Sequence, residues 1–144
     1  MDKAMVTLEY ELRRLADIIK NEGRSELVKH DITDTQFMAI QWIKEAGPLN
    51  IGTLAKHMNL AISSTSELVD ALSKNGFAER VKSIEDRRKV SIQLTPKGLS
   101  IIDAVILKRR KYLSDLVEKS IDDDLPILID QIHKLYSATE EGGN

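Results

Sequence analysis

Two short polar segments of this 144-residue chain carry side chains that could bind a large anionic ligand. The first segment consists of hydroxyl residues followed by an acid, in the order Ser63, Ser64, Thr65, Ser66 and Glu67. At the start of a helix, short hydroxyl side chains let the backbone approach phosphates and base edges, and the helix N–H groups attract anions. The alternative interpretation is that these hydroxyls only cap the helix, because serine and threonine are favoured N-cap residues.

The second segment is strongly basic, with Asp86 followed by Arg87, Arg88 and Lys89. From position 80 to 97 there are six basic residues and two acidic ones, whereas from position 118 onward there are two basic residues and seven acidic ones. The formal net charge of −2 therefore conceals a basic region and an acidic region. Because clustered Lys and Arg residues attract phosphates, this distribution favours a nucleic-acid ligand more than the net charge does.

The residues available for catalysis or metal binding are few. The chain has no cysteine, which excludes disulfides, thiolate catalysis and zinc sites with sulfur ligands. Its three histidines, His30, His57 and His133, are widely separated, and there is no glycine-rich phosphate loop or nucleophile elbow. We therefore predict no enzymatic activity, no cofactor and no metal. No apolar stretch approaches the length of a membrane span, so we expect no membrane partner and a cytoplasmic location.

The length fits one domain, and an aromatic content of 4% within a hydrophobic content of 42% predicts an aliphatic core. Residues Thr33 and Gln36 form a capping-box pattern, Asn50 can cap a short helix, and Thr95 followed by Pro96 is a strong helix start. Hydrophobic spacing then gives the order of elements. We predict helices up to Asn21, from Thr33 to Gly47, over 51–58 and from Ser63 to Gly76, strands over 77–83 and 90–94, and helices over 96–119 and from Leu125, with a frayed end over 140–144.

Two helices joined by a tight turn at Asn59 and followed by a charged hairpin have the order of a winged helix-turn-helix. Asn tolerates the left-handed conformation that such a turn often needs. Apolar residues at Leu54, Met58, Leu60 and Leu68 could lock the two helices together. The predicted fold class is mostly α with a small β-hairpin wing, in which a winged helix-turn-helix domain is joined to a helical dimerisation region.

The hairpin sequence resembles that of the MarR family. The stretches that carry this resemblance are Gly76-Phe77-Ala78-Glu79-Arg80, the wing from Glu85 to Gly98, and Leu68-Val69-Asp70-x-Leu72. The resemblance implies a homodimeric transcription regulator that binds double-stranded DNA at a palindromic operator. It divides the chain into a dimerisation helix (1–30), a DNA-binding region (31–98) and further dimerisation helices (99–144). The expected dimer contacts are apolar residues of the first and last helices, namely Leu8, Leu12, Leu15, Leu125, Leu128, Ile132 and Leu135.

The resemblance also assigns the DNA contacts. It implies that Arg88 enters the minor groove and that Asp86 holds it in position, although the two could instead form only an exposed ion pair. Arg87 and Lys89 add charge where phosphates would lie. Residues 63–66 match the family's base- and backbone-contacting positions. On the first wing strand, Arg80 and Lys82 would either contact phosphates or form a solvated face.

This sequence departs from the family where many members carry arginines in the recognition helix, because here those positions are Glu67 and Ala71. Glu67 could accept a hydrogen bond from a cytosine amino group, or it could cap the N–H of Ser64 in a capping box. Net acidity and this weakened helix leave open a second function, a protein-interaction adaptor that does not bind DNA. The resemblance also leaves open a zinc-responsive regulator, with a site made by His30 and nearby carboxylates.

The resemblance further implies a repressor that a small aromatic or anionic effector releases from its operator. Such an effector would bind in a cleft between the dimer helices and the winged domain. Residues that could line the cleft are aromatic, namely Tyr10, Phe37, Trp42 and Tyr112, although core packing is the other interpretation for most of them.

Overall fold

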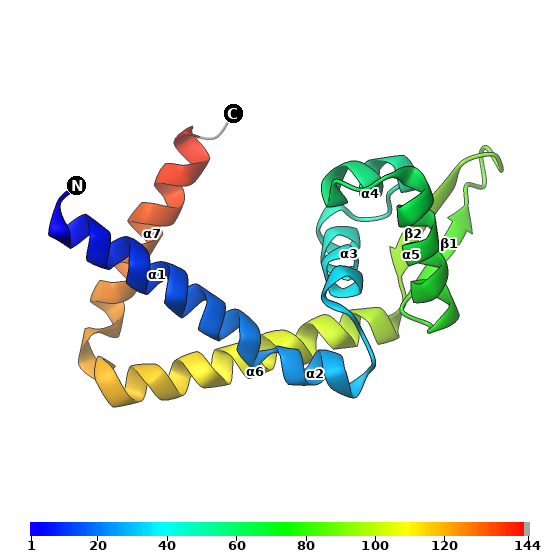
Figure 1. Cartoon of the computed structure of the whole chain (residues 1–144). Helices are drawn as coiled ribbons and strands as arrows, with labels where there is room; N and C mark the ends of the chain where they lie inside the picture. Colours follow the sequence, from blue (N-terminus) through cyan, green and yellow to red (C-terminus); the bar gives the residue numbers. More distant parts are fainter. Residues whose placement is uncertain (143–144) are drawn as a thin grey trace. The chain divides into compact units, whose positions relative to one another are not determined.

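The computed structural model describes residues 1–142 and contains seven α-helices and one antiparallel hairpin within that range (Figure 1). It divides into two compact units, Met1–Arg109 and Arg110–Asn144, and each is considered by itself. The elements are α1 (Lys3–Glu22), α2 (Arg24–Lys29), α3 (Asp34–Ala46), α4 (Ile51–Met58), α5 (Ile62–Lys74), β1 (Ala78–Lys82), β2 (Val90–Leu94), α6 (Pro96–Ser120), a 3-10 turn (Asp122–Asp124) and α7 (Leu125–Gly142).

Local capping signals fix most of the helix ends. Thr33 and Gln36 form the predicted capping box at the start of α3, and the Asn50 side chain accepts a hydrogen bond from the Thr53 N–H at 2.8 Å. Asn59 ends α4 in the left-handed conformation, with φ 55° and ψ 46°. The Thr95 hydroxyl accepts a hydrogen bond from the Gly98 N–H at 3.1 Å, so Thr95 caps α6. All four predictions are confirmed.

Two helix starts differ from the predictions. The six-residue helix α2 was not predicted; it follows Gly23, where an added Cβ would lie 2.6 Å from the Val105 side chain. Helix α5 begins at Ile62 rather than in the serine run, and its N-cap is Ala61, which makes no side-chain capping bond. In the second unit, α7 continues through Glu140 and Glu141 rather than fraying there, and positions 143–144 lie outside the described residues.

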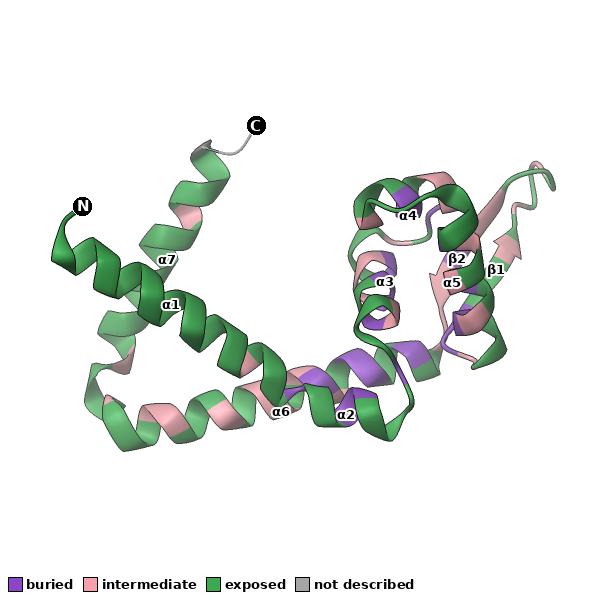
Figure 2. Ribbon diagram, viewed as in Figure 1, coloured by how far each residue is buried: buried purple, intermediate pink, exposed green. Residues whose placement is uncertain are grey.

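The core lies among α3, α4, α5, the hairpin and the first half of α6 (Figure 2). It is largely aliphatic, as the composition predicts, with Phe37 and Phe77 as its buried aromatic residues. Burying such side chains is the main stabilisation of the winged unit, at about 1.5–3 kcal/mol for each large one. The large aliphatic side chains with almost no exposed surface are Ile40, Ile43, Leu54, Val69, Leu72, Ile92, Ile101 and Val105.

The hairpin is anchored at its base from two sides. Strands β1 and β2 pair from Ala78 with Leu94 to Lys82 with Val90. Leu49, in the loop before α4, exchanges two backbone hydrogen bonds with Ile92 of β2. On the other side, a Cβ at Gly98 would overlap the Phe77 carbonyl oxygen, so the first turn of α6 packs directly on the chain entering β1.

Helices α1 and α7 each expose an apolar stripe within their own unit. No residue of α1 is buried, and no residue of α7 up to position 141 is buried. Among the described residues, no helix is both long enough and apolar enough to span a membrane.

Candidate nucleic-acid interface

Helix α5 has one buried face, formed by Thr65, Val69 and Leu72. Thr65 has no exposed surface, and its hydroxyl donates a hydrogen bond to the Ala61 carbonyl at 2.9 Å. The prediction that Thr65 contacts DNA is therefore corrected, because its side chain is buried in the core and cannot reach a ligand at the surface. The sequence could not separate it from its neighbours, since the helix start lies before the hydroxyl run.

The opposite face of α5 presents a polar ridge. Successive helical residues are rotated by about 100°, so Ser63, Glu67, Asp70 and Lys74 lie within about 50° of the direction opposite the buried face. All four are exposed. Of the other two serines, Ser64 is exposed and Ser66 is half-buried. We call the set Ser63, Glu67, Asp70 and Lys74 the α5 ridge.

The capping box predicted for Glu67 is wrong. That pattern requires Ser64 to be the N-cap, whereas the N-cap is Ala61 and Ser64 lies inside the helix. Within residues 1–142, Glu67 has no salt bridge and no side-chain hydrogen bond. Its carboxylate therefore belongs to the exposed ridge and not to the end of the helix.

Arg80 joins the wing to the recognition helix. Its guanidinium Nη1 lies 2.5 Å from the Asp70 carboxylate, which connects β1 to the α5 ridge. Neither interpretation made from the sequence, a phosphate contact or a solvated face, included this pair. The Arg80 guanidinium balances the charge of the Asp70 carboxylate. Glu67 is then the acidic residue of the α5 ridge whose charge is not balanced by a neighbouring cation.

The tip of the wing is organised around Asp86. Its Oδ1 accepts hydrogen bonds from the Arg88 backbone N–H at 3.0 Å and from Arg88 Nε at 3.1 Å. These bonds from Arg88 hold the pKa of the Asp86 carboxyl below its usual value. The loop is closed by hydrogen bonds between the Ser83 N–H and the Lys89 carbonyl and between the Lys89 N–H and the Asp86 carbonyl, both at 2.9 Å. The Arg88 side chain remains 92% exposed, so it is both oriented and accessible.

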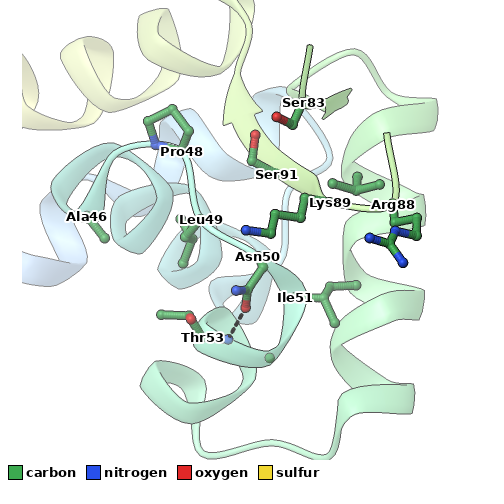
Figure 3. Close-up of a pocket in the computed structure, with 12 residues that line it drawn as sticks. Ala46, Pro48, Leu49, Asn50, Ile51, Thr53, Ser83, Arg88, Lys89 and Ser91 are labelled. Atoms are coloured by element: carbon green, nitrogen blue, oxygen red, sulfur yellow. Dashed lines mark hydrogen bonds between the residues drawn. The ribbon is translucent and has the colours of Figure 1, made fainter. Parts of the chain in front are cut away.

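The other basic residues of the wing, Lys82, Arg87 and Lys89, are also exposed. A groove of about 830 Å³ separates the wing from the start of α4, with Arg88 and Lys89 on its wing side and Asn50 on its α4 side (Figure 3). A polar helix ridge and a basic hairpin on one compact unit are the two parts with which such folds contact a duplex. The fold and this site define a winged helix-turn-helix protein, a class that binds DNA.

The chain belongs to the MarR family of helix-turn-helix (HTH) transcriptional regulators. The MarR family model matches residues 32–90. The chain is 44% identical over 128 residues to the "Uncharacterized HTH-type transcriptional regulator YsmB" of Bacillus subtilis (strain 168), covering 89% of this chain and 88% of that protein. It is also 33% identical over 96 residues to the "HTH-type transcriptional regulator SarZ" of Staphylococcus haemolyticus (strain JCSC1435), covering 67% of this chain and 62% of that protein. Both relatives are regulators rather than enzymes, which agrees with the sequence-based prediction.

Solved structures share the fold. A MarR family protein from Bacillus stearothermophilus aligns with a TM-score of 0.78 and 36% identity, over 97% of this chain and 99% of that one. A complex of S. aureus MepR with DNA aligns with a TM-score of 0.71 and 20% identity, over 90% of this chain and 98% of that one. The MepR likeness concerns the fold alone.

A second cleft lies in the first unit among α1, α3 and α6, the region in which the family resemblance implies an effector cleft. It has a volume of about 390 Å³ and is lined by Ala16, Ile19, Lys20, Gln41 and Arg109. None of the four aromatic residues predicted for an effector cleft lines it. Phe37 is in the core, Trp42 stacks on His57 with ring centroids 4.5 Å apart, and Tyr10 is exposed.

The histidines form no metal site among the described residues, where no three His, Asp or Glu side chains are grouped suitably. Glu26, the carboxylate closest to His30, is nearly buried and lies 3.4 Å from Lys108 and 3.5 Å from Lys29. Burial raises its pKa, but the Lys108 and Lys29 ammonium groups outweigh this and hold the pKa below its usual value. Glu26 therefore ties α2 to α6 through ion pairs.

Proposed function

We propose that the protein acts as a homodimer, in the cytoplasm, that binds a palindromic operator and represses transcription until a small ligand releases it. The observation that carries the DNA-binding part is the placement of the α5 ridge opposite the buried face, beside a wing whose tip presents an oriented arginine. In this proposal the ridge lies in the major groove, and Arg88 enters the adjacent minor groove.

The contacts divide by chemistry. Exposed Ser63, Ser64 and the partly exposed Ser66 would donate hydrogen bonds to phosphates or base edges. The exposed cations Lys82, Arg87 and Lys89 would bind phosphates, whereas Arg80 acts mainly by holding Asp70. The fully buried Thr65 contributes no contact.

Dimerisation is supported by the apolar stripes of α1 and α7. Leu8, Leu12 and Leu15 of α1 are between 37% and 41% exposed, and Leu128, Ile132 and Leu135 of α7 are between 39% and 50% exposed, while Leu125 is half-buried. So much exposed aliphatic surface on a monomer would favour association. A two-fold dimer would place its recognition helices about 34–36 Å apart, which matches one turn of B-DNA.

The cleft among α1, α3 and α6 supports release by an anionic ligand. Arg109 lines this cleft, and its guanidinium lies 5.9 Å from the Phe37 ring centre. Lys20 and Gln41 add a second cation and an amide. A carboxylate with an apolar body would complement these groups together with Ala16 and Ile19. Such a ligand could release DNA only by binding more tightly to a conformation of the dimer that does not fit the operator than to the conformation that does.

The test of DNA binding is an anisotropy titration with the duplex from upstream of the protein's own gene, at about 50 and 200 mM salt. If a dimer makes about 6–10 phosphate contacts, its affinity should fall roughly 10³- to 10⁵-fold between these concentrations. Absence of binding at low salt would refute the proposal and favour the adaptor function.

The test of dimerisation uses Leu12→Asp and Ile132→Asp, with sedimentation to measure mass and anisotropy to measure DNA binding. Both variants should be monomers that bind the operator poorly, because each charge would lie in the dimer interface. An L12D monomer with full affinity would refute this part.

A further inference from the structure

Glu67 occupies the centre of the α5 ridge. Thr65, Val69 and Leu72 are buried, and the helical rotation of about 100° per residue places Glu67 almost opposite their mean direction. Ser63 precedes it by one turn on the same line. If the N-terminal half of the ridge lies in a major groove, Glu67 is therefore the long side chain of that half that points most directly at the base edges.

The neighbours of Glu67 leave its charge uncompensated. Asp70, one turn further on, is held by Arg80, so neither of these residues is available to it. Lys74 stands two turns away, in the last turn of the helix. Within residues 1–142 no cation lies within salt-bridge distance of the Glu67 carboxylate.

A carboxylate in this position needs a hydrogen-bond donor from the DNA. An ionised carboxylate only accepts hydrogen bonds, and removing it from water without a partner is costly. Phosphate oxygens repel it. In the major groove the donors are the amino groups of cytosine and adenine, whereas guanine presents only acceptors and thymine presents an acceptor and a methyl group.

Cytosine suits the carboxylate better than adenine does. The cytosine N4 amino group is the only hydrogen-bonding group that this base presents in the major groove, so no acceptor opposes the second carboxylate oxygen. In adenine the N6 donor stands beside the N7 acceptor, which matches an amide better than a carboxylate.

We propose that Glu67 determines operator specificity by selecting cytosine at one position in each half-site and rejecting guanine there. This inference rests on the proposed binding of α5 in the major groove. Because α5 carries no Arg or Lys before Lys74, Glu67 sets specificity at its position without competition from a guanine-reading cation.

The test is selection from a randomised operator library by the wild-type dimer, Glu67→Gln and Glu67→Ala. The wild type should enrich cytosine at one position per half-site. E67Q should shift that preference to adenine by roughly 5- to 150-fold, because glutamine pairs with both N6 and N7 of adenine. E67A should lose preference there and bind unrelated DNA more tightly, since a repelling charge has been removed.

Glu45→Gln is the matched control, because Glu45 is an exposed acid in the last turn of α3 and the change in charge is the same. It should leave every base preference unchanged. If the wild type binds its operator but E67Q selects the same bases, the role of Glu67 is refuted while DNA binding stands. If the wild type binds no DNA, the proposed function and this inference both fail.

Discussion

Replacing Asp86 with alanine separates two effects that act in opposite directions on DNA binding. In the proposed complex Asp86 would place a negative charge near the phosphates, so by charge alone its removal should strengthen binding. It also holds Arg88 through backbone and side-chain hydrogen bonds at 3.0 and 3.1 Å, so its removal should leave Arg88 without a fixed orientation. The sign of the change in affinity shows which effect is larger.

The positioning effect should prevail. Ordering a long cationic side chain costs up to about 2 kcal/mol of conformational entropy, and Arg88 in the free wing is already partly ordered. If the D86A substitution shifts half of that entropy cost to the binding step, each wing contributes about 1 kcal/mol less binding free energy. For the two wings of a dimer, this weakens DNA binding about 30-fold. A charge about 10 Å from a phosphate, screened by one Debye length of salt, changes affinity less than about twofold for the dimer.

The assay is fluorescence anisotropy with the operator duplex at about 100 mM salt. Glu85→Ala is the control, because Glu85 is the adjacent exposed acid of the wing and makes no hydrogen bond with Arg88. D86A should bind about 10- to 30-fold more weakly and E85A slightly more tightly, with thermal unfolding unchanged in both. If D86A instead tightens binding as E85A does, Asp86 has no positioning role and the reasoning is wrong.

Three further substitutions test the packing. Gly98→Ala should destabilise the protein by roughly 1–3 kcal/mol in urea denaturation, since the new Cβ would meet the Phe77 carbonyl oxygen; wild-type stability would contradict this contact. Thr65→Val should lower the free energy of unfolding by about 0.5–1.5 kcal/mol but leave operator affinity unchanged in anisotropy. Weaker DNA binding with unchanged stability would instead show that Thr65 contacts DNA. The depressed pKa of Glu26 means that its ionised form stabilises the fold above the ordinary carboxyl pKa and that this contribution is lost as pH falls through the lower, folded-state pKa. Lys108→Met should therefore destabilise the protein at pH 7, and its difference from the wild type in urea denaturation should shrink as the pH falls through the folded-state pKa of Glu26; a difference that does not change with pH would exclude the Glu26 ion pair as its cause.

Signals confined to a few neighbouring residues allowed much of the fold to be predicted. The Thr33 capping box, the Asn50 cap and the left-handed Asn59 each depend on side-chain and backbone groups within three residues. The alternation around Ile92 likewise gave the second strand. Because both partners of each interaction lie within one short stretch of sequence, the residue pattern is enough to predict the interaction.

The parts that were missed depend on contacts between distant segments. Helix α2 forms where the Gly23 backbone meets α6, more than eighty positions away. The pairing of Arg80 with Asp70 joins a strand to a helix and has no sequence pattern of its own. Thr65 was misassigned because Ala61 starts the helix without a side-chain cap, and one hydroxyl among four could not be recognised as the buried one.

The close packing of Gly98 on Phe77 makes the first turn of α6 a pivot shared with the root of the wing. No side chain lies between the two backbones to absorb a displacement. Any tilt of the first turn of α6 must therefore also move the start of the hairpin, so in the proposed function a ligand bound at Arg109 would act on the wing through α6.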